Sequence, residues 1–327
     1  MEYRKLGRTG LKVSELCLGT MTFRWTSSEP QSYKVLDRAW DAGINFIDTA
    51  DVYSFWAPGN EGGVSERIIG KWLKRKPREQ VIIATKVRGR MWQGPNGQGL
   101  SRHHIMHAVE DSLCRLQTDY IDLYQTHWPD WETPLDETLR ALDDLVTAGK
   151  VRYIGASNHP AWLLMKTMWI SERLNVARYD CVQPHYNLVN RAEVEPDLAH
   201  VCMDQGIGMI PYSPLAGGFL TGKYTREHAP EGARHTGSER IKSLMTEQNF
   251  RLLDELAEMG QARGKTLVQM ALGWQLTQPF VTAPIIGANT IAQLDESLGA
   301  AGLRLSDEEM QRLDDLTGMN RDWLQNV

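Results

Sequence analysis

Short apolar runs alternate with amphipathic stretches along this chain of 327 residues. The runs show no alternation of apolar and polar positions, which indicates strands buried on both faces of a parallel sheet. Between them, apolar residues three and four positions apart predict helices. The eight runs cover residues 16–20, 46–50, 81–86, 120–127, 153–158, 180–187, 208–214 and 283–288.

The number and order of these units predict the fold class. Eight strand–helix units close a (β/α)8 barrel, the TIM barrel, and residues 3–14 predict an N-terminal β-hairpin before it. A doubly wound α/β sheet is the rival, but its Gly-x-Gly-x-x-Gly turn is missing after the first strand. No linker or shift of composition divides residues 1–327, so we expect a single barrel domain.

Composition and charge narrow the class of protein. Apolar residues make up 42% and charged residues 24%, which is typical of a soluble globular protein. The net charge of -5 argues against nucleic acid or a membrane surface as the main partner. No run approaches the roughly 18 to 20 apolar residues of a membrane span, and the first residues do not resemble a signal peptide. The cysteines are scattered, which indicates reduced thiols, and we expect a cytoplasmic protein.

Reactive residue types stand at the predicted carboxyl ends of the strands, where barrels of this kind hold their active sites. Asp48 ends the second strand, Tyr53 follows in the loop, and Lys86 and His127 end the third and fourth. Burying a carboxylate without a partner is costly, so we expect Lys86 to pair with Asp48. A nearby ammonium favours the phenolate, so we expect Lys86 to lower the pKa of Tyr53 from about 10.

Together these side chains suit the reduction of a carbonyl group. Tyr53 can protonate an oxygen as it becomes an alkoxide, and His127 can orient that oxygen or share the proton. No side chain donates a hydride, so a cofactor must supply it.

In order and spacing, five motifs resemble the aldo-keto reductase family over essentially the whole chain. They are Asp48-Thr49-Ala50-x-x-Tyr53, Ala84-Thr85-Lys86, Gln125-Thr126-His127, Gly155-Ala156-Ser157-Asn158 and Tyr212-Ser213-Pro214-Leu215. The resemblance implies that Tyr53 is the general acid, that Lys86 and Asp48 tune it, and that His127 orients the carbonyl. It points to the branch that contains potassium-channel β subunits and related bacterial NADPH-dependent reductases.

The resemblance also implies a nicotinamide cofactor. Ser157, Asn158 and Gln183 would hold the carboxamide, Tyr212 would stack on the ring, and the glycine-rich loop after Pro214 would cover the pyrophosphate. The residues expected to bind the cofactor are Gly19, Thr20, Met21, Asp48, Ser157, Asn158, Gln183, Tyr212, Ser213, Pro214, Leu215, Gly217, Leu220, Gly222, Lys223, Arg234, Ile286, Gly287, Ala288, Gln293 and Glu296.

Two cations in this set bear on the choice between NADP(H) and NAD(H). Lys223 and Arg234 are the candidates for binding a 2′-phosphate, which favours NADP(H). The family pattern is not followed everywhere, since Gln293 stands where many relatives have arginine and Ser297 where many have asparagine. Both departures weaken the preference for NADP(H) without reversing it.

The chain contains 11 tryptophans, and ten of them fall into two groups by position. Those that follow the first four strands would line the mouth of the site: Trp25, Trp56, Trp92, Trp128 and Trp131. With Tyr53 and His127, we expect substrate contacts from Trp25, Trp56, Trp92 and Trp128, in a broad apolar pocket for a bulky or aromatic carbonyl compound. Tryptophans at helical spacing are expected in the core: Trp40, Trp72, Trp162, Trp169 and Trp274.

The residues therefore predict an enzyme that reduces an aldehyde or ketone with NADPH, or oxidises the matching alcohol. Two alternatives stay open: a regulatory subunit that binds NADPH and turns over slowly, and a non-redox barrel enzyme in which Lys86 forms a Schiff base. Asp48 argues against the second. No metal is expected, because His103, His104 and His107 lack carboxylate or cysteine partners and indicate a solvated helix face. The oligomeric state is left open.

Overall fold

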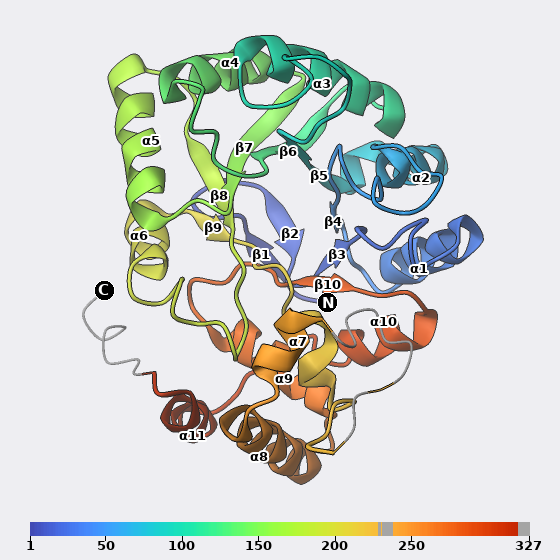
Figure 1. The fold of residues 1–327 in the computed structure, drawn as a ribbon, viewed down its shortest axis with the longest axis vertical. Helices are drawn as coiled ribbons and strands as arrows, with labels where there is room; N and C mark the ends of the chain where they lie inside the picture. The colour runs from blue at the N-terminus through green and yellow to red at the C-terminus, as the bar shows by residue number, and fades with distance from the viewer. Residues whose placement is uncertain (228–229, 231–237, 320–327) are drawn as a thin grey trace.

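The computed structural model describes residues 1–227, 230 and 238–319. Its centre is a curled parallel sheet, drawn in Figure 1, with the strand order β10-β3-β4-β5-β6-β7-β8-β9. The strands are β3 (Cys17–Gly19), β4 (Phe46–Asp48), β5 (Ile82–Val87), β6 (Ile121–Thr126), β7 (Val151–Ser157), β8 (Tyr179–Gln183), β9 (Gly208–Met209) and β10 (Ile285–Gly287).

The two ends of this sheet meet. Met209 in β9 bridges Val281 in parallel, and the main-chain N–H of Ile285 donates to the carbonyl of Pro211 at 2.9 Å. Each strand coincides with one of the eight apolar runs, so the predicted (β/α)8 barrel is confirmed.

The predicted N-terminal hairpin is also present. β1 (Tyr3–Lys5) pairs antiparallel with β2 (Lys12–Ser14). Its apolar residues Leu6 and Val13 pack with strand residues that point into the barrel, among them Phe46 and Leu123. The hairpin therefore closes one end of the barrel and leaves the other end, where the strands finish, for a site.

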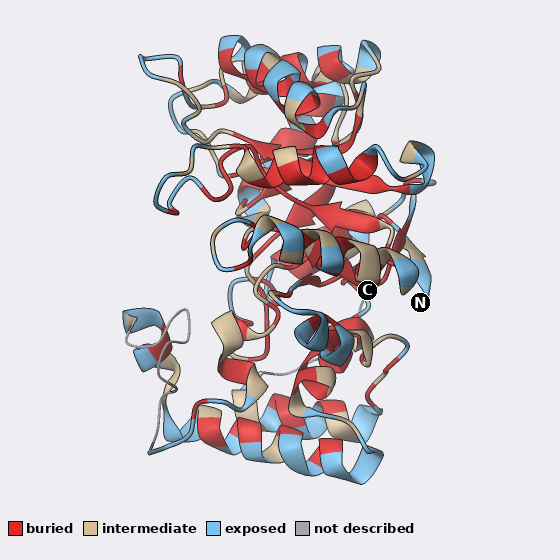
Figure 2. Ribbon diagram, turned by 90° about the vertical axis from the view of Figure 1, so that its right-hand side faces the viewer, coloured by how far each residue is buried: buried red, intermediate tan, exposed pale blue. Residues whose placement is uncertain are grey.

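Helices enclose the sheet, and Figure 2 shows the strands and the inward sides of the helices as buried. They are α1 (Glu29–Asp41), α2 (Val64–Leu73), α3 (Arg102–Leu116), α4 (Leu135–Thr147), α5 (Ala161–Leu174), α6 (Leu198–Gln205), α7 (Glu239–Leu244), α8 (Glu247–Arg263), α9 (Leu267–Thr277), α10 (Ile291–Leu298) and α11 (Asp307–Thr317), with 3-10 turns η1 (Arg78–Gln80) and η2 (Ala216–Thr221). No helix in the described part of the chain is long and apolar enough to cross a bilayer.

The prediction for the helical tryptophans is partly wrong. Trp72 and Trp274 are fully buried as expected, but Trp162 and Trp169 of α5 are 59% and 58% exposed. α5 turns a different face inward, which includes Leu163, Leu164, Thr167 and Met168. Helical spacing groups residues on one face, but it does not tell which of two apolar faces packs on the sheet.

Candidate active site

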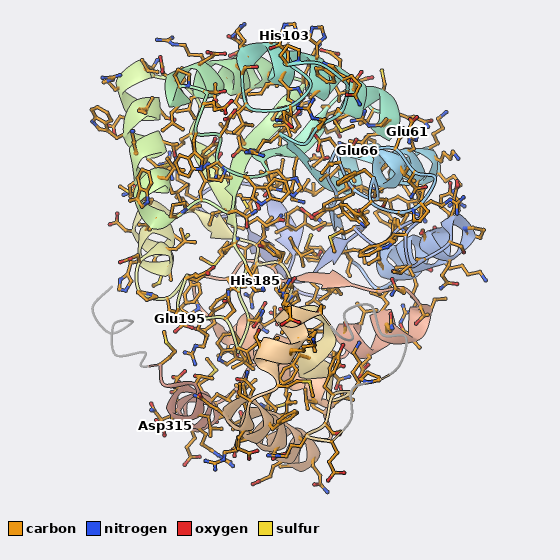
Figure 3. The ribbon with its side chains drawn as sticks, in the orientation of Figure 1. Glu61, Glu66, His103, His185, Glu195 and Asp315 are labelled. Carbon is orange, nitrogen blue, oxygen red and sulfur yellow. The ribbon has the colours of Figure 1, made fainter. Side chains whose placement is uncertain are left out.

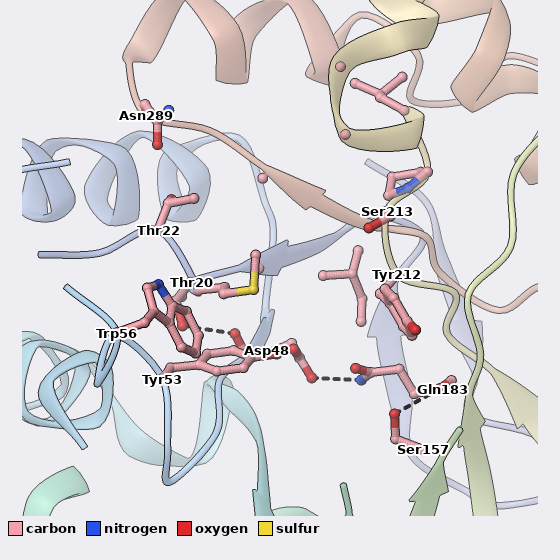
Figure 4. Close-up of a pocket in the computed structure, with 18 of the residues that line it drawn as sticks. Thr20, Thr22, Asp48, Tyr53, Trp56, Ser157, Gln183, Tyr212, Ser213 and Asn289 are labelled. Carbon is pink, nitrogen blue, oxygen red and sulfur yellow. Dashed lines mark hydrogen bonds between the residues drawn. The ribbon is translucent and has the colours of Figure 1, made fainter. Parts of the chain in front are cut away.

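Three strand ends and one loop bring the predicted catalytic residues together. Asp48 is the last residue of β4, Lys86 lies near the end of β5, and His127 directly follows β6. Tyr53 reaches the same place from the loop after β4, as Figure 4 shows for Asp48 and Tyr53. We call these four side chains the rim cluster.

Lys86 is the centre of the rim cluster. Its side chain is 0% exposed, and Nζ donates to Asp48 Oδ1 at 2.6 Å, to the carbonyl of Thr49 at 2.7 Å and to the hydroxyl of Tyr53 at 3.0 Å. An ammonium has three donors, and each has an acceptor here. Burial disfavours its charge, but Asp48 and Tyr53 outweigh that effect and raise the pKa of Lys86 above its ordinary value. Lys86 therefore stays protonated and has no lone pair for a Schiff base.

The hydrogen bond from Lys86 sets the direction of the Tyr53 hydroxyl. The phenol oxygen accepts from the ammonium, so its own proton points elsewhere. Burial raises the pKa of Tyr53 to about 12, although the charge of Lys86 acts to lower it. The expected lowering is therefore wrong, because removing the phenolate from water outweighs the cation, whose effect Asp48 partly cancels. At neutral pH Tyr53 is a phenol that still holds its proton.

His127 is a neutral imidazole beside this phenol. Burial and the nearby cations Lys86 and Arg88 lower the pKa of His127 well below its usual value. The ring stacks on Trp128, with 3.7 Å between centroids. Its Nδ1 is buried and has no hydrogen-bond partner among the described residues, which leaves Nε2 as the ring nitrogen that can reach the cavity.

A chain of polar side chains continues from Asp48 across β7 and β8. Gln183 donates from Nε2 to Asp48 Oδ2 at 2.8 Å, and Ser157 donates to the carbonyl of Gln183 at 2.9 Å, as Figure 4 shows. The hydroxyl of Tyr212 donates to Asn158 Oδ1 at 2.9 Å. Asn158 has a φ of 59°, a conformation uncommon outside glycine that is often found at functional sites.

These residues line a cavity of about 850 Å³ at the carboxyl ends of the strands. From the catalytic and substrate sets, it is lined by Asp48, Tyr53, Trp56, His127 and Trp128. From the cofactor set, it is lined by Gly19, Thr20, Met21, Ser157, Asn158, Gln183, Tyr212, Ser213, Pro214, Leu215, Gly217, Lys223, Gly287, Gln293 and Glu296.

Several expected contacts do not line the cavity. Ile286 and Ala288 are buried in the core, because side chains alternate along β10 and it is Ile285 and Gly287 that face the cavity. The others outside its lining are Lys86 (which lies behind Tyr53), Leu220, Gly222, Trp25 and Trp92. Arg234 lies outside the described residues.

The two expected substrate tryptophans outside the lining pack on other aromatic rings. Trp25 packs edge-on against Trp56, with centroids 5.5 Å apart, and it is Trp56 that lines the cavity. Trp92 packs against His104 at 4.7 Å, which places it away from the cavity wall. The positions of Trp25 and Trp92 after strands were not enough to identify wall residues.

Arg240 lines the cavity, but the sequence pattern did not predict it as a site residue. It lies on α7, and its Nη2 is 2.6 Å from Nε2 of His185, which is labelled in Figure 3. The ring of His185 stacks on Tyr212 at 5.3 Å. Ser238 caps α7 through its side chain, and a serine before a glutamate is the start signal that could have revealed this helix. Gly218 and Thr221 also line the cavity and belong to the glycine-rich loop that we expected to cover the pyrophosphate. Other lining residues outside the predicted set of contacts are Thr22, Val52, Phe55, Gly89, Arg90, Val268, Ile285, Asn289 and Ser297.

The three histidines of α3 differ from the predicted solvated face in one respect. His103 and His107 are exposed, but His104 is buried with Nδ1 3.0 Å from the carbonyl of Asn96. Within residues 1–227, 230 and 238–319, no group of three or more histidine, cysteine or acidic side chains is placed to hold a metal ion.

The fold is a barrel with polar side chains gathered at the carboxyl ends of its strands, the place where enzymes of this fold hold their active sites. The model of the Aldo/keto reductase family matches residues 15–317, and the chain belongs to this family. It is 39% identical to the uncharacterized oxidoreductase YrpG of Bacillus subtilis, over 97% of this chain and 96% of the relative. It is 34% identical to L-glyceraldehyde 3-phosphate reductase of Escherichia coli O157:H7, over 96% and 92% of the two chains.

A third relative comes from the branch that the motifs indicated. The chain is 34% identical to a probable voltage-gated potassium channel subunit beta of Oryza sativa subsp. japonica, over 92% of this chain and 91% of the relative. The expected membership of the family and the expected branch are therefore both confirmed.

Proposed function

We propose that this protein reduces an aldehyde or a ketone to the alcohol with NADPH, or catalyses the reverse reaction. The observation that carries the proposal is the hydrogen bond from Lys86 to the Tyr53 oxygen, because it leaves the phenolic proton free for a substrate in the cavity. Bound nicotinamide would supply the hydride, which no side chain can provide.

Tyr53 delivers the proton to the carbonyl oxygen as negative charge develops there. The phenolate that remains accepts a charge-assisted hydrogen bond from Lys86, whose ammonium is 3.0 Å away in the resting enzyme. Asp48 holds that ammonium in place at 2.6 Å. The neutral His127 can donate an N–H to the same substrate oxygen, which orients the carbonyl and stabilises its developing charge.

The donors and acceptors near the rim cluster fit a nicotinamide. The Ser157 hydroxyl and the amides of Asn158 and Gln183 present both donors and acceptors, which matches a carboxamide. The face of Tyr212 offers a stacking surface for the ring. All of these groups are tied by hydrogen bonds to the barrel or to each other, so the site is organised before a ligand binds.

The glycine-rich loop fits the phosphate groups of the cofactor. Gly217 and Gly218 have φ values of 68° and 97°, which residues with a Cβ rarely adopt. A Cβ on Gly218 would also lie 2.6 Å from Nζ of Lys223. Glycine therefore lets the backbone approach a ligand beside this cation.

A 2′-phosphate would be bound by Lys223 and by Gln293 at the start of α10. Gln293 accepts from the main-chain N–H of Asn289 through Oε1 at 2.8 Å, so its amide N–H groups point away from that contact and can donate to phosphate oxygens. Arg234 remains a candidate for the same role, although it lies outside the described residues. The charge of Lys223 favours NADPH over NADH, and the neutral Gln293 adds less to this preference than an arginine there would.

The wall near Tyr53 favours a bulky or aromatic carbonyl compound. Phe55, Trp56 and Trp128 line the cavity around the phenol, and the ring centroid of Trp56 is 6.2 Å from that of Tyr53. Large aromatic surfaces of this kind stabilise an apolar substrate through burial and ring packing.

The proposal is tested by a panel of aliphatic and aromatic aldehydes and ketones, followed by the loss of NADPH absorbance. We expect turnover with NADPH and faster consumption of the aromatic members. Fluorescence titration should show tighter binding of NADPH than of NADH, and Lys223→Ala should reduce that difference. Tight NADPH binding with negligible turnover across the panel would instead favour the regulatory subunit, and equal affinities would refute the phosphate assignment.

A further inference from the structure

A second cavity lies on the other side of the loop that carries His127 and Trp128. It measures about 260 Å³ and is lined by residues of the loop after β6, by the start of α5 and by β8. Its lining includes Trp131, His159, Trp162, Leu163, Lys166 and Tyr179, none of which lines the larger cavity. The two cavities therefore have separate walls.

His159 brings a polar atom to this second cavity. Its side chain is only 3% exposed, and Nδ1 is 2.9 Å from the carbonyl of Ser157. A carbonyl oxygen can only accept, so Nδ1 carries the proton and Nε2 carries a lone pair. Burial lowers the pKa of His159 to about 4, so this lone pair is present at neutral pH.

The lone pair of His159 Nε2 has no partner in the described part of the chain. Since the ring lines the second cavity, Nε2 is an acceptor for a molecule inside it. Nε2 of His159 is not among the buried polar atoms that lack a partner, so water can reach it inside the cavity. A ligand that displaces this water keeps the hydrogen bond to Nε2 only if it donates one.

The other walls are of two kinds: Asp130, Thr133, Thr138 and Lys166 are polar, and the rest are aromatic or apolar. Tyr179 packs edge-on against His159 with centroids 5.8 Å apart, and Leu163 lies beside them. At the mouth, Trp131 and Trp162 stack in nearly parallel planes, 6.1 Å between centroids and 19° between planes. Both tryptophans are largely exposed, which is unusual for rings of this size on a protein without a partner there.

The volume limits the size of the occupant. An engineered apolar cavity of about 150 Å³ in another protein holds benzene, and drug-sized ligands need about 300 to 1,000 Å³. The second cavity, at about 260 Å³, lies between these values. It suits one substituted ring.

We propose that the second cavity binds a small single-ring aromatic molecule with one hydrogen-bond donor, of the chemical class of phenol. The donor meets Nε2 of His159, and the ring packs on Tyr179, Leu163 and the Trp131–Trp162 pair. This site is independent of the proposed reductase chemistry, because none of its named residues belongs to the rim cluster.

Phenol and toluene are the matched probes, since they differ in the donor and hardly in size. Calorimetry on the NADPH-saturated protein should show phenol binding at least about tenfold more tightly than toluene, the ratio that one hydrogen bond of about 1.4 kcal/mol produces. His159→Leu should remove this preference and leave toluene binding in place. In the 15N spectrum, phenol should shift the signal of His159 Nε2.

Two further variants locate the site and guard against misfolding of the His159 variant. Trp162 is exposed, so Trp162→Ala is expected to fold, and it should weaken the binding of both probes. Trp56→Ala, in the wall of the larger cavity, should leave phenol binding unchanged. The proposal is overturned if phenol does not bind and only water occupies the cavity, if His159→Leu keeps the preference, or if Trp56→Ala rather than Trp162→Ala removes binding.

Discussion

Two buried clusters in this protein each combine a tyrosine, a cation and a carboxylate, but their hydrogen bonds run in different directions. The rim cluster joins Tyr53 to Lys86 and Asp48. A second group, the α11 cluster, consists of Tyr186, Arg191, Glu195 and Asp314, and Figure 3 labels its Glu195. Each cluster combines a buried phenol, a cation and a carboxylate, but the α11 cluster lines neither of the two cavities described above.

The difference lies in the direction of one hydrogen bond. Tyr53 accepts from its cation and keeps its proton for the cavity, whereas Tyr186 donates its proton to Glu195 Oε1 at 2.7 Å. Arg191 then binds Glu195 through two bonds of 2.6 and 2.9 Å and Asp314 of α11 at 2.6 Å. The proton of Tyr186 is therefore used inside the α11 cluster, which ties α11 to the loop after β8. A buried phenol beside a cation is thus poised for acid chemistry only when its proton is left free.

Removing the cation should affect the two clusters unequally, and this is the largest expected difference. Lys86→Met leaves Asp48 buried without its partner and removes the charge that stabilises the phenolate. We expect carbonyl reduction to fall by about 10² to 10⁴, together with a loss of about 3 to 5 kcal/mol in the free energy of unfolding. Steady-state kinetics and urea unfolding measure the two effects.

Arg191→Met is the matched control for the change at Lys86. It removes the buried guanidinium that binds Glu195 and Asp314 and should destabilise the protein by a similar amount, about 3 to 5 kcal/mol. Its kcat/KM per folded molecule should stay within about threefold of the wild type, since a change of that size is under 1 kcal/mol. A large loss of activity in folded Arg191→Met protein would break the contrast between the clusters.

Tyr186→Phe should affect stability alone. The change removes a hydrogen bond to a charged group, which contributes about 1.5 to 3 kcal/mol, and leaves the cavity walls in place. Chemical unfolding should show this loss while carbonyl reduction is unchanged. Reduced turnover without reduced stability would contradict a purely structural role for the α11 cluster.

The pH profile of reduction should show the smallest effect. Burial raises the pKa of Tyr53 to about 12 and lowers that of His127 well below its ordinary value. Tyr53 thus stays protonated and His127 neutral across the usual assay range. We expect kcat/KM for reduction to vary less than about threefold between about pH 6 and 9. If kcat/KM for reduction fell tenfold per pH unit above neutrality, Lys86 would lower the pKa of Tyr53 after all.

The strands and the rim cluster were predictable for a physical reason. Buried parallel strands are continuous apolar runs, so a polar residue such as Asp48 at the end of one stands out. Because these ends share one rim, Asp48, Lys86 and His127 could be brought together without a structure. The α11 cluster was not predictable in this way, since Arg191 and Asp314 lie 123 positions apart and follow no strand-end pattern.

The sequence could not reveal the sign of the pKa shift at Tyr53, nor which face of the helix α5 packs on the sheet. The sign of the pKa shift at Tyr53 depends on how far burial outweighs Lys86, which requires the packed structure. Trp162 and Trp169 share a helix face, but the spacing did not reveal that this face points outward. Arg240 lies in a polar stretch with weak periodicity, and the cations expected from the family resemblance were Lys223 and Arg234.

The central claim is that the free proton of Tyr53 is the acid in carbonyl reduction, and Tyr53→Phe tests it most directly. The change removes that proton while Lys86 keeps its bonds to Asp48 and the carbonyl of Thr49. NADPH affinity measured by fluorescence should stay the same, and kcat for reduction of the best aldehyde in the panel should fall by about 10² to 10⁴. A variant that binds NADPH normally and reduces the aldehyde at the wild-type rate would contradict the account.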